Sequence, residues 1–179
     1  MLPGCCGVAA APVPSYGMSS FNQSRPRLAA ADFETHGIRL HVVLGLFGIW
    51  HLARVHRDFE GDLLSALILG EVAHHNIVAL ASADGARLDP VFESLGLKGA
   101  EARLLPCNVH SIAMACDIPR ETVRRKVAAL VDRGWLQRNA KSELFVTSLP
   151  AEHFREFNVE FANRLLEAAD QIRSIVSPR

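Results

Sequence analysis

The segment Pro119–Gly134 constrains the fold most, because it has the boundaries and the periodicity of one amphipathic helix. Proline suits the first turn of a helix, and glycine suits the position just beyond its end. At 100° per residue, Val123, Val127 and Leu130 fall on one side of this helix, and most of its charged side chains fall on the opposite side or the flanks. We therefore expect a helix that packs on a core through one face and presents a basic surface on the other.

The positive charge of the chain is local. Lys plus Arg and Asp plus Glu each number 19 in 179 residues, so the net charge is zero and gives no argument for a nucleic-acid partner. Between Arg120 and Glu143, however, seven basic residues stand against three acidic ones. Any nucleic-acid contact is therefore expected in this stretch.

Short elements are expected on both sides of the basic helix. Asn108 is suited to cap a short helix over residues 109–115, and the residues Cys116-Asp117-Ile118 predict a tight turn before Pro119. After Gly134, the runs W-L-Q-R and L-F-V-T-S indicate two short strands joined by the polar run N-A-K-S-E. The predicted order is helix, turn, basic helix and hairpin.

Two apolar helices are expected before this unit. Residues 36–57 are apolar almost all round, which predicts a buried central helix, and residues 59–81 predict a second helix. Their combined apolar surface exceeds what one small domain covers, so we infer a homodimer interface here. The apolar run 40–53 is too short to span a bilayer, and we expect no membrane partner.

The C-terminal helix, expected after Pro150, carries an apolar stripe that requires a partner helix. Its members are Phe154, Phe157, Phe161, Leu165, Ala168, Ile172 and Ile175. Together these patterns predict four parts: a flexible Pro/Ala/Gly-rich tail (1–31), an apolar helical pair (32–84), a unit with the basic helix and the hairpin that is the candidate for nucleic-acid contact (85–149), and a dimerisation helix (150–179). A short helix at 91–97 is expected to connect the helical pair to this unit.

The run N-V-H-S-I-A-M-A-C-D-I-P-R-E-T-V-R-R-K-V-A-A-L-V-D-R-G-W-L-Q-R, followed by N-A-K-S-E and L-F-V-T, resembles the winged helix-turn-helix of bacterial transcription regulators. The similarity covers about 40 of 179 residues. Cys116 and Asp117 stand where the family often has a small residue and a glycine, and Asp tolerates the backbone of such a turn. The flanking helices resemble MarR-like regulators in outline only. The implied fold is mostly α with a small β-hairpin wing, framed by N- and C-terminal dimerisation helices.

The resemblance implies a cytoplasmic, dimeric transcription regulator that binds double-stranded DNA at a pseudo-palindromic operator. Helix 119–133 would lie in the major groove and wing 138–143 would reach adjacent phosphates or the minor groove. Arginines suit guanine or phosphate, glutamate suits cytosine, and threonine suits a phosphate or a thymine methyl. The expected DNA contacts are Arg120, Glu121, Thr122, Arg124, Arg125, Lys126, Arg138, Asn139 and Lys141.

Two alternatives remain for the basic helix. It could be only a solvated face, or the winged module could be an adaptor that docks on an acidic protein partner without reading DNA.

The polar residues Glu71, His74, His75 and Asn76 interrupt the second apolar helix. They could line a pocket for a small-molecule effector, lie on a solvent edge, or pair across a dimer axis. Glu71 and His74 are spaced as in carboxylate-bridged metal sites, but the chain has no second Glu-x-x-His, so we expect no metal.

Other chemistry finds little support in the sequence. The four cysteines lack paired metal spacing, which fits a reduced cytoplasmic setting. There is no G-x-S-x-G motif and no glycine-rich phosphate loop. We therefore expect neither a cofactor nor enzyme activity.

Overall fold

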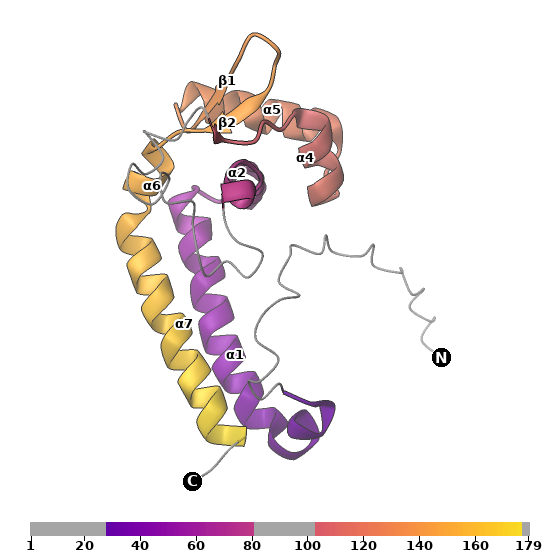
Figure 1. Cartoon of the computed structure of the whole chain (residues 1–179). Coiled ribbons are helices and arrows are strands. Elements are labelled where there is room, and N and C mark those ends of the chain that lie inside the picture. Colours follow the sequence, from indigo (N-terminus) through magenta and orange to yellow (C-terminus); the bar gives the residue numbers. More distant parts are fainter. Residues whose placement is uncertain (1–27, 81–102, 177–179) are drawn as a thin grey trace.

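The structure, a computed structural model, describes residues 28–80 and 103–176. This part of the chain is mostly helical, with a single two-stranded antiparallel sheet, which confirms the expected mostly α class with a hairpin. Figure 1 shows α1 and α7 side by side, and α4, α5 and the hairpin together at one end. The elements are α1 (Ala30–Asp58), α2 (Leu63–Ile77), the 3₁₀ turn η2 (Val78–Leu80), α4 (Val109–Cys116), α5 (Arg120–Asp132), β1 (Leu136–Arg138), β2 (Leu144–Val146), α6 (Leu149–His153) and α7 (Arg155–Val176).

Some sequence predictions fall on other parts of the chain. The expected short helix at 91–97, the expected boundary at 84/85 and the expected tail up to residue 27 lie outside the described residues. The end of that tail is different from the prediction, because residues 30 and 31 already belong to α1.

The larger core joins α2 to α4, α5 and the hairpin. Ile68 and Val72 of α2 are fully buried in one cluster with Val123 and Val127 of α5 and with Ile112 of α4. The two apolar helices of residues 32–84 thus have different main partners, because α2 packs mainly on the C-terminal elements. Its apolar face covers the apolar face of α5, which the hairpin and α4 alone leave open.

The true partner of α1 is α7 (Figure 1). Aromatic rings make the central contacts: the ring centroids of Phe47 and Phe161 lie 5.4 Å apart, those of His51 and Phe161 4.8 Å, and those of Trp50 and Phe157 6.2 Å. The stripe on the C-terminal helix thus finds its partner helix in the same chain. We had expected this stripe in a dimer contact, and α1 occupies it instead.

Helix α1 is not the buried central helix that its composition predicts. Only Leu40 and Val43 are buried along its length, in a small cluster with Ile175. The reason is geometric: one helix, α7, covers only one side of α1, and no other described element lies along the opposite side.

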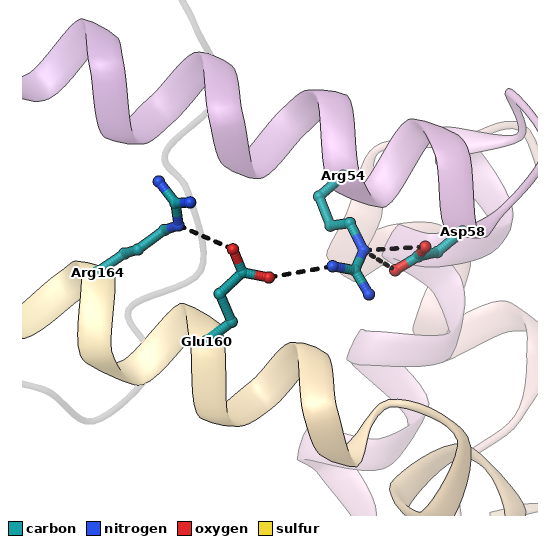
Figure 2. A network of polar contacts seen from close by, with 4 residues as sticks. All are labelled: Arg54, Asp58, Glu160 and Arg164. Carbon is teal, nitrogen blue, oxygen red and sulfur yellow. Dashed lines mark hydrogen bonds and ion pairs between the residues drawn. The ribbon is translucent and has the colours of Figure 1, made fainter.

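An ion-pair network holds α1 and α7 in register, as Figure 2 shows. Arg54 donates from Nε to Asp58 at 3.0 Å within α1, and from Nη1 to Oε2 of Glu160 on α7 at 3.1 Å. Glu160 also accepts from Nε of Arg164 at 3.0 Å. Because Arg54, Asp58 and Glu160 are partly buried, each of these charges has a partner where solvation is incomplete; Arg164 is exposed.

The C-terminal helix is divided near its start. The short α6 ends at His153, and α7 begins at Arg155. Phe154, expected as the first member of the stripe, instead packs against Phe59 and Trp135, with ring centroids 5.4 Å and 5.2 Å away. This residue links the core around α2 to the α1–α7 pair.

By length and composition alone, α1 is apolar enough to cross a membrane, and 11% of its most apolar window is buried. Its uncharged stretch is the run between Arg39 and Arg54. At 1.5 Å per residue this stretch is roughly 21 Å long, whereas the hydrocarbon core of a bilayer is about 30 Å thick.

The α1–α7 contact gives a first prediction. Phe157→Asp places a carboxylate between Trp50 and His51, so we expect the free energy of unfolding to fall by about 3 kcal/mol. Leu166→Asp, at a side chain of α7 that is 62% exposed, is the matched control and should change it by less than about 0.5 kcal/mol. Urea unfolding followed by circular dichroism measures both; equal losses would contradict the described packing.

Candidate nucleic-acid interface

Helix α4 and the turn after it are fixed by local hydrogen bonds. Oδ1 of Asn108 accepts from the backbone N–H groups of His110 (2.9 Å) and Ser111 (3.0 Å), and Oγ of Ser111 accepts from N–H of Asn108 (3.1 Å). The helix ends at Asp117, whose φ of 52° is left-handed. Asp is one of the few residues other than glycine that adopt this conformation readily. Both the predicted cap and the predicted turn are confirmed.

Helix α5 is oriented by its buried face. Val123 and Val127 are fully buried and Leu130 nearly so. Because the opposite face of a helix must then point outward, Glu121 and Arg125 are exposed. The expected division of α5 into a core face and a charged face is what the structure shows.

Lys126 has a different role from the one expected. Its Nζ donates to Oδ2 of Asp62 at 2.6 Å, and its side chain is only 22% exposed. Asp62 is also the N-cap of α2, where it accepts from N–H and Oγ of Ser65. Lys126 therefore fastens α5 to the start of α2 and does not belong to the outward surface.

The pKa of Asp62 reflects this arrangement. Partial burial acts to raise the pKa, but hydrogen bonds from Lys126 and Ser65 outweigh it, so the pKa lies below its ordinary value. The carboxylate therefore stays charged, and it stabilises the α2–α5 contact above the acid range.

Glu121 and Arg124 form a bidentate pair on the outward face. Nε and Nη2 of Arg124 donate to the two carboxylate oxygens of Glu121 at 2.8 Å and 2.6 Å. The hydrogen bond from Arg124 lowers the pKa of Glu121. Because both side chains are more than 60% exposed, the pair can open toward a ligand at little cost.

Arg120 and Arg125 are exposed on the same helix, and Thr122 is half-buried beside them. On the hairpin, Arg138 and Lys141 are exposed as expected. Of the expected contact residues, this leaves four cations on the outward surface besides the Arg124 of the ion pair.

Asn139, also expected to contact DNA, is used within the hairpin. Its Oδ1 accepts from the backbone N–H groups of Lys141 and Glu143, both at 3.0 Å, and its Nδ2 donates to Oε2 of Glu143 at 2.6 Å. Asn139 therefore shapes the turn that presents Lys141, and its own polar atoms are engaged.

Asn76 is a structural residue that the sequence analysis had grouped with the possible pocket residues. It is fully buried, and its Nδ2 donates to the carbonyls of Leu105 (2.6 Å) and Leu144 (3.2 Å). Its Oδ1 accepts from N–H of Val146 at 2.7 Å. One side chain thus joins α2 to the segment before α4 and to β2. The available signal was its spacing of four residues from Val72, which places this polar side chain on the apolar face of the helix.

The three residues expected to line an effector pocket are not brought together. Glu71 and His74 border an open groove of about 970 Å³ between α1, α2 and the α6–α7 junction. His75 lies elsewhere, with its Nε2 3.2 Å from the carbonyl oxygen of Pro106. The groove is otherwise lined mainly by apolar side chains, among them Val55, Leu67 and Phe157.

The two cysteines of the described residues and the possible metal ligands among those residues are the remaining candidates for chemistry. Burial, with a smaller contribution from Glu71, raises the pKa of both Cys107 and Cys116 to about 11, so both remain thiols at neutral pH. Within residues 28–80 and 103–176, no group of three or more His, Cys, Asp or Glu side chains could hold a metal ion.

Comparisons with known protein families, with curated proteins and with solved structures give no match for this chain. Every functional statement about it therefore depends on the geometry above and on the resemblance of its sequence motif.

Asn76 gives a second prediction. In Asn76→Ala, the buried N–H of Val146 and the carbonyls of Leu105 and Leu144 lose their hydrogen bonds to this side chain, so we expect the free energy of unfolding to fall by about 3 kcal/mol. The control is His75→Ala, which removes one exposed hydrogen bond from the neighbouring position and should cost less than about 1 kcal/mol. Urea unfolding followed by tryptophan fluorescence compares them, and a near-neutral Asn76→Ala would contradict the assigned role.

A third prediction separates the two lysines. Lys126→Ala leaves Asp62 without its partner and should lower the free energy of unfolding by about 1 kcal/mol, whereas Lys141→Ala, on the exposed turn, should leave it within about 0.5 kcal/mol. The destabilisation by Lys126→Ala should vanish as pH falls and Asp62 is protonated. Because the pKa of Asp62 is lowered in the folded protein, this destabilisation vanishes only as pH falls through that lowered pKa, so unfolding is measured in steps from pH 7 into the acid range; a pH-independent loss of stability would count against the ion pair.

Proposed function

We propose that the protein is a cytoplasmic transcription regulator that binds double-stranded DNA as a homodimer and reads a pseudo-palindromic operator. In this proposal α4, the turn and α5 are a helix-turn-helix, and β1–β2 is its wing. The observation that carries the proposal is the orientation of α5: its apolar face is fixed in the core while Arg120, Arg124 and Arg125 remain exposed on one surface.

The dimensions and chemistry of that surface suit a major groove. B-DNA admits one α-helix in this groove, and a guanidinium donates two parallel hydrogen bonds to O6 and N7 of guanine. Ala128 and Ala129 keep the exposed face of α5 slim where it would approach the bases. Arg125, which is exposed and points away from the buried valines, is the residue we expect to read a base.

The Glu121–Arg124 pair contributes in a different way. In the free protein the two charges satisfy each other, so the surface is less positive than its arginines suggest. Solvent screens an exposed ion pair strongly, so Arg124 can exchange Glu121 for guanine or phosphate, and Glu121 can then accept from cytosine. This exchange favours DNA sites that offer both a guanine or phosphate to Arg124 and a cytosine to Glu121.

The hairpin supplies contacts that position the protein. Arg138 and Lys141 are exposed on β1 and the turn, and Asn139 holds the turn in shape. Such cations bind phosphates regardless of sequence, so they add affinity and fix the register of α5.

The proposal predicts that selection from a random DNA pool enriches a two-fold symmetric motif at two salt concentrations. Arg125→Ala should weaken binding to that motif at least about 30-fold and relax the preference at one base pair per half-site, since one bidentate contact is lost in each of the two half-sites. Lys141→Ala should weaken all sequences alike and lower the salt dependence by about two counterions per dimer, one for each copy.

Two controls sharpen the comparison. Lys126→Ala removes a cation from the same helix but not from the outward surface, so the base preference should be unchanged. Arg173→Ala removes an exposed cation from the far end of α7 and should leave affinity unchanged. No enrichment at either salt concentration would overturn the proposal and favour an adaptor that docks on an acidic protein.

A further inference from the structure

The side of α1 that faces away from α7 carries a continuous apolar stripe. Its large members are strongly exposed: Ile38 by 85%, Val42 by 55%, Ile49 by 69% and Leu52 by 54%. Their spacing of 4, 7 and 3 residues keeps them on one side of a helix. A side chain of this type is normally found inside a protein, so the stripe lacks a partner among the described residues.

The order of residues along this stripe is symmetric about Gly45. Ile38 and Leu52 lie seven residues to either side of it, and Val42 and Ile49 lie three and four residues to either side. An acidic and a basic side chain, both exposed, close the stripe at eleven residues to either side. From one end to the other the stripe reads Glu34, Ile38, Val42, Gly45, Ile49, Leu52 and His56.

Such a pattern is self-complementary. When a second copy of α1 packs antiparallel about a two-fold axis at Gly45, Ile38 meets Leu52 of the other copy, and Glu34 meets His56. Isologous dimers require this property, namely that one patch fits its own copy. The antiparallel arrangement also places the opposite ends of the two helix dipoles side by side.

Gly45 allows the two helices to approach closely at the axis. Apart from the backbone of α1 itself and the two neighbouring residues, no atom of the described residues lies within 4 Å of the position that a Cβ on residue 45 would take. With helix axes roughly 8–10 Å apart and Cα atoms at about 2.3 Å from each axis, two copies of Gly45 lie roughly 4–6 Å apart.

The area is sufficient for an interface. Complete burial of an aliphatic side chain stabilises by roughly 1.5–3 kcal/mol, at about 25 cal/mol for each Å² of apolar surface removed from water. One such side chain therefore removes roughly 60–120 Å² of surface from water. Counting Leu46, which is 70% exposed beside the stripe, five such side chains lose roughly 200–400 Å² per copy. Because apolar atoms form about 60% of an interface, the total over both copies is on the order of 1,000 Å², the size of a specific contact.

We infer that α1 is the homodimer interface, with two copies packed antiparallel and crossing at Gly45. The inference rests on the homodimer of the proposed function, which leaves the dimer-forming surface open. A membrane surface suits the stripe less well, because interfacial helices are flanked by many Lys and Arg. Between Glu34 and His56, the only basic side chains on the flanks of this stripe are Arg39 and His41.

A cysteine cross-link tests the geometry. In full-length protein carrying Cys5→Ser and Cys6→Ser, Gly45→Cys should give a covalent dimer on mild oxidation with diamide, because a disulfide needs Cα atoms within about 7 Å. Ile38→Cys is the matched control: its two copies lie roughly 21 Å apart in the antiparallel arrangement, so it should stay uncross-linked. Cross-linking of both variants indicates parallel helices, and cross-linking of neither excludes this interface; either result overturns the inference.

A second measurement tests the stripe without added cysteines. Ile49→Asp should raise the dimer dissociation constant at least about 100-fold in light scattering, because the change occurs in both copies and buries two carboxylates. Leu166→Asp on α7 should leave the constant unchanged. An unaltered dimer in Ile49→Asp overturns the inference. A parent chain that is monomeric in light scattering also overturns the inference. This holds both when the chain co-floats with phosphatidylglycerol-containing vesicles and when it does not.

Both measurements are made without DNA, so the two proposals fail separately. A covalent Gly45→Cys dimer that enriches no DNA would remove the proposed function and keep the interface. An enriched palindrome together with an intact Ile49→Asp dimer would do the reverse.

Discussion

Burial of one face of α5 against α2 is the contact on which the rest of the structure depends. Once Val123 and Val127 are enclosed, the direction of every other side chain of α5 is settled, and the arginines have only the outward side to occupy. The polar contacts around this core also hold α2 against its neighbours. Lys126 and Asp62 join the two helices at the start of α2, and Asn76 joins α2 to the hairpin. When all hydrogen bonds of such polar groups are made, they select one packing of the core over other packings that would bury similar apolar surface.

Much of this unit could be predicted because its signals are local. The cap at Asn108, the left-handed turn at Asp117 and the glycine stop at Gly134 each depend on a few neighbouring residues, and the structure confirms them. The periodicity of α5 also gave its buried face correctly. Lys126 shows the limit of that method: its angle on the helix lies at the edge of the charged face, and only the position of Asp62, 64 residues earlier, decides that it turns inward. Asn139 shows a related limit, because a polar residue at a turn can serve its own backbone as well as a ligand, and the hydrogen bonds within the hairpin are visible only in the structure.

The pairing of the long helices could not be predicted from their patterns. An amphipathic stripe requires a partner but does not identify it, and a helix that is apolar almost all round, as α1 is, does not even indicate which side the partner takes. The choice of α7 is made by features that are specific only in combination: aromatic side chains at matching heights, and Arg54 placed to bridge Asp58 and Glu160 (Figure 2). For the same reason the sequence alone does not indicate that α2, which is apolar and follows α1 directly, packs mainly on α5, β2 and α4.

The zero net charge is consistent with a division between these two parts of the molecule. The excess of cations lies on α5 and the hairpin, whereas the α1–α7 pair carries neutralising ion pairs and an exposed apolar side. A protein with a strongly positive surface everywhere binds any DNA through counterion release, and its specificity falls accordingly. Confining the cations to one helix face, with Arg124 held by Glu121 until a better partner is offered, limits this non-specific term. In the proposed regulator, discrimination between the operator and other DNA then depends on few contacts per half-site. A second half-site at a fixed distance is needed to raise the specificity of the dimer. The rigid α1–α7 pair, tied to the core through Phe59, Phe154 and Trp135, is the part of the chain that could set that distance.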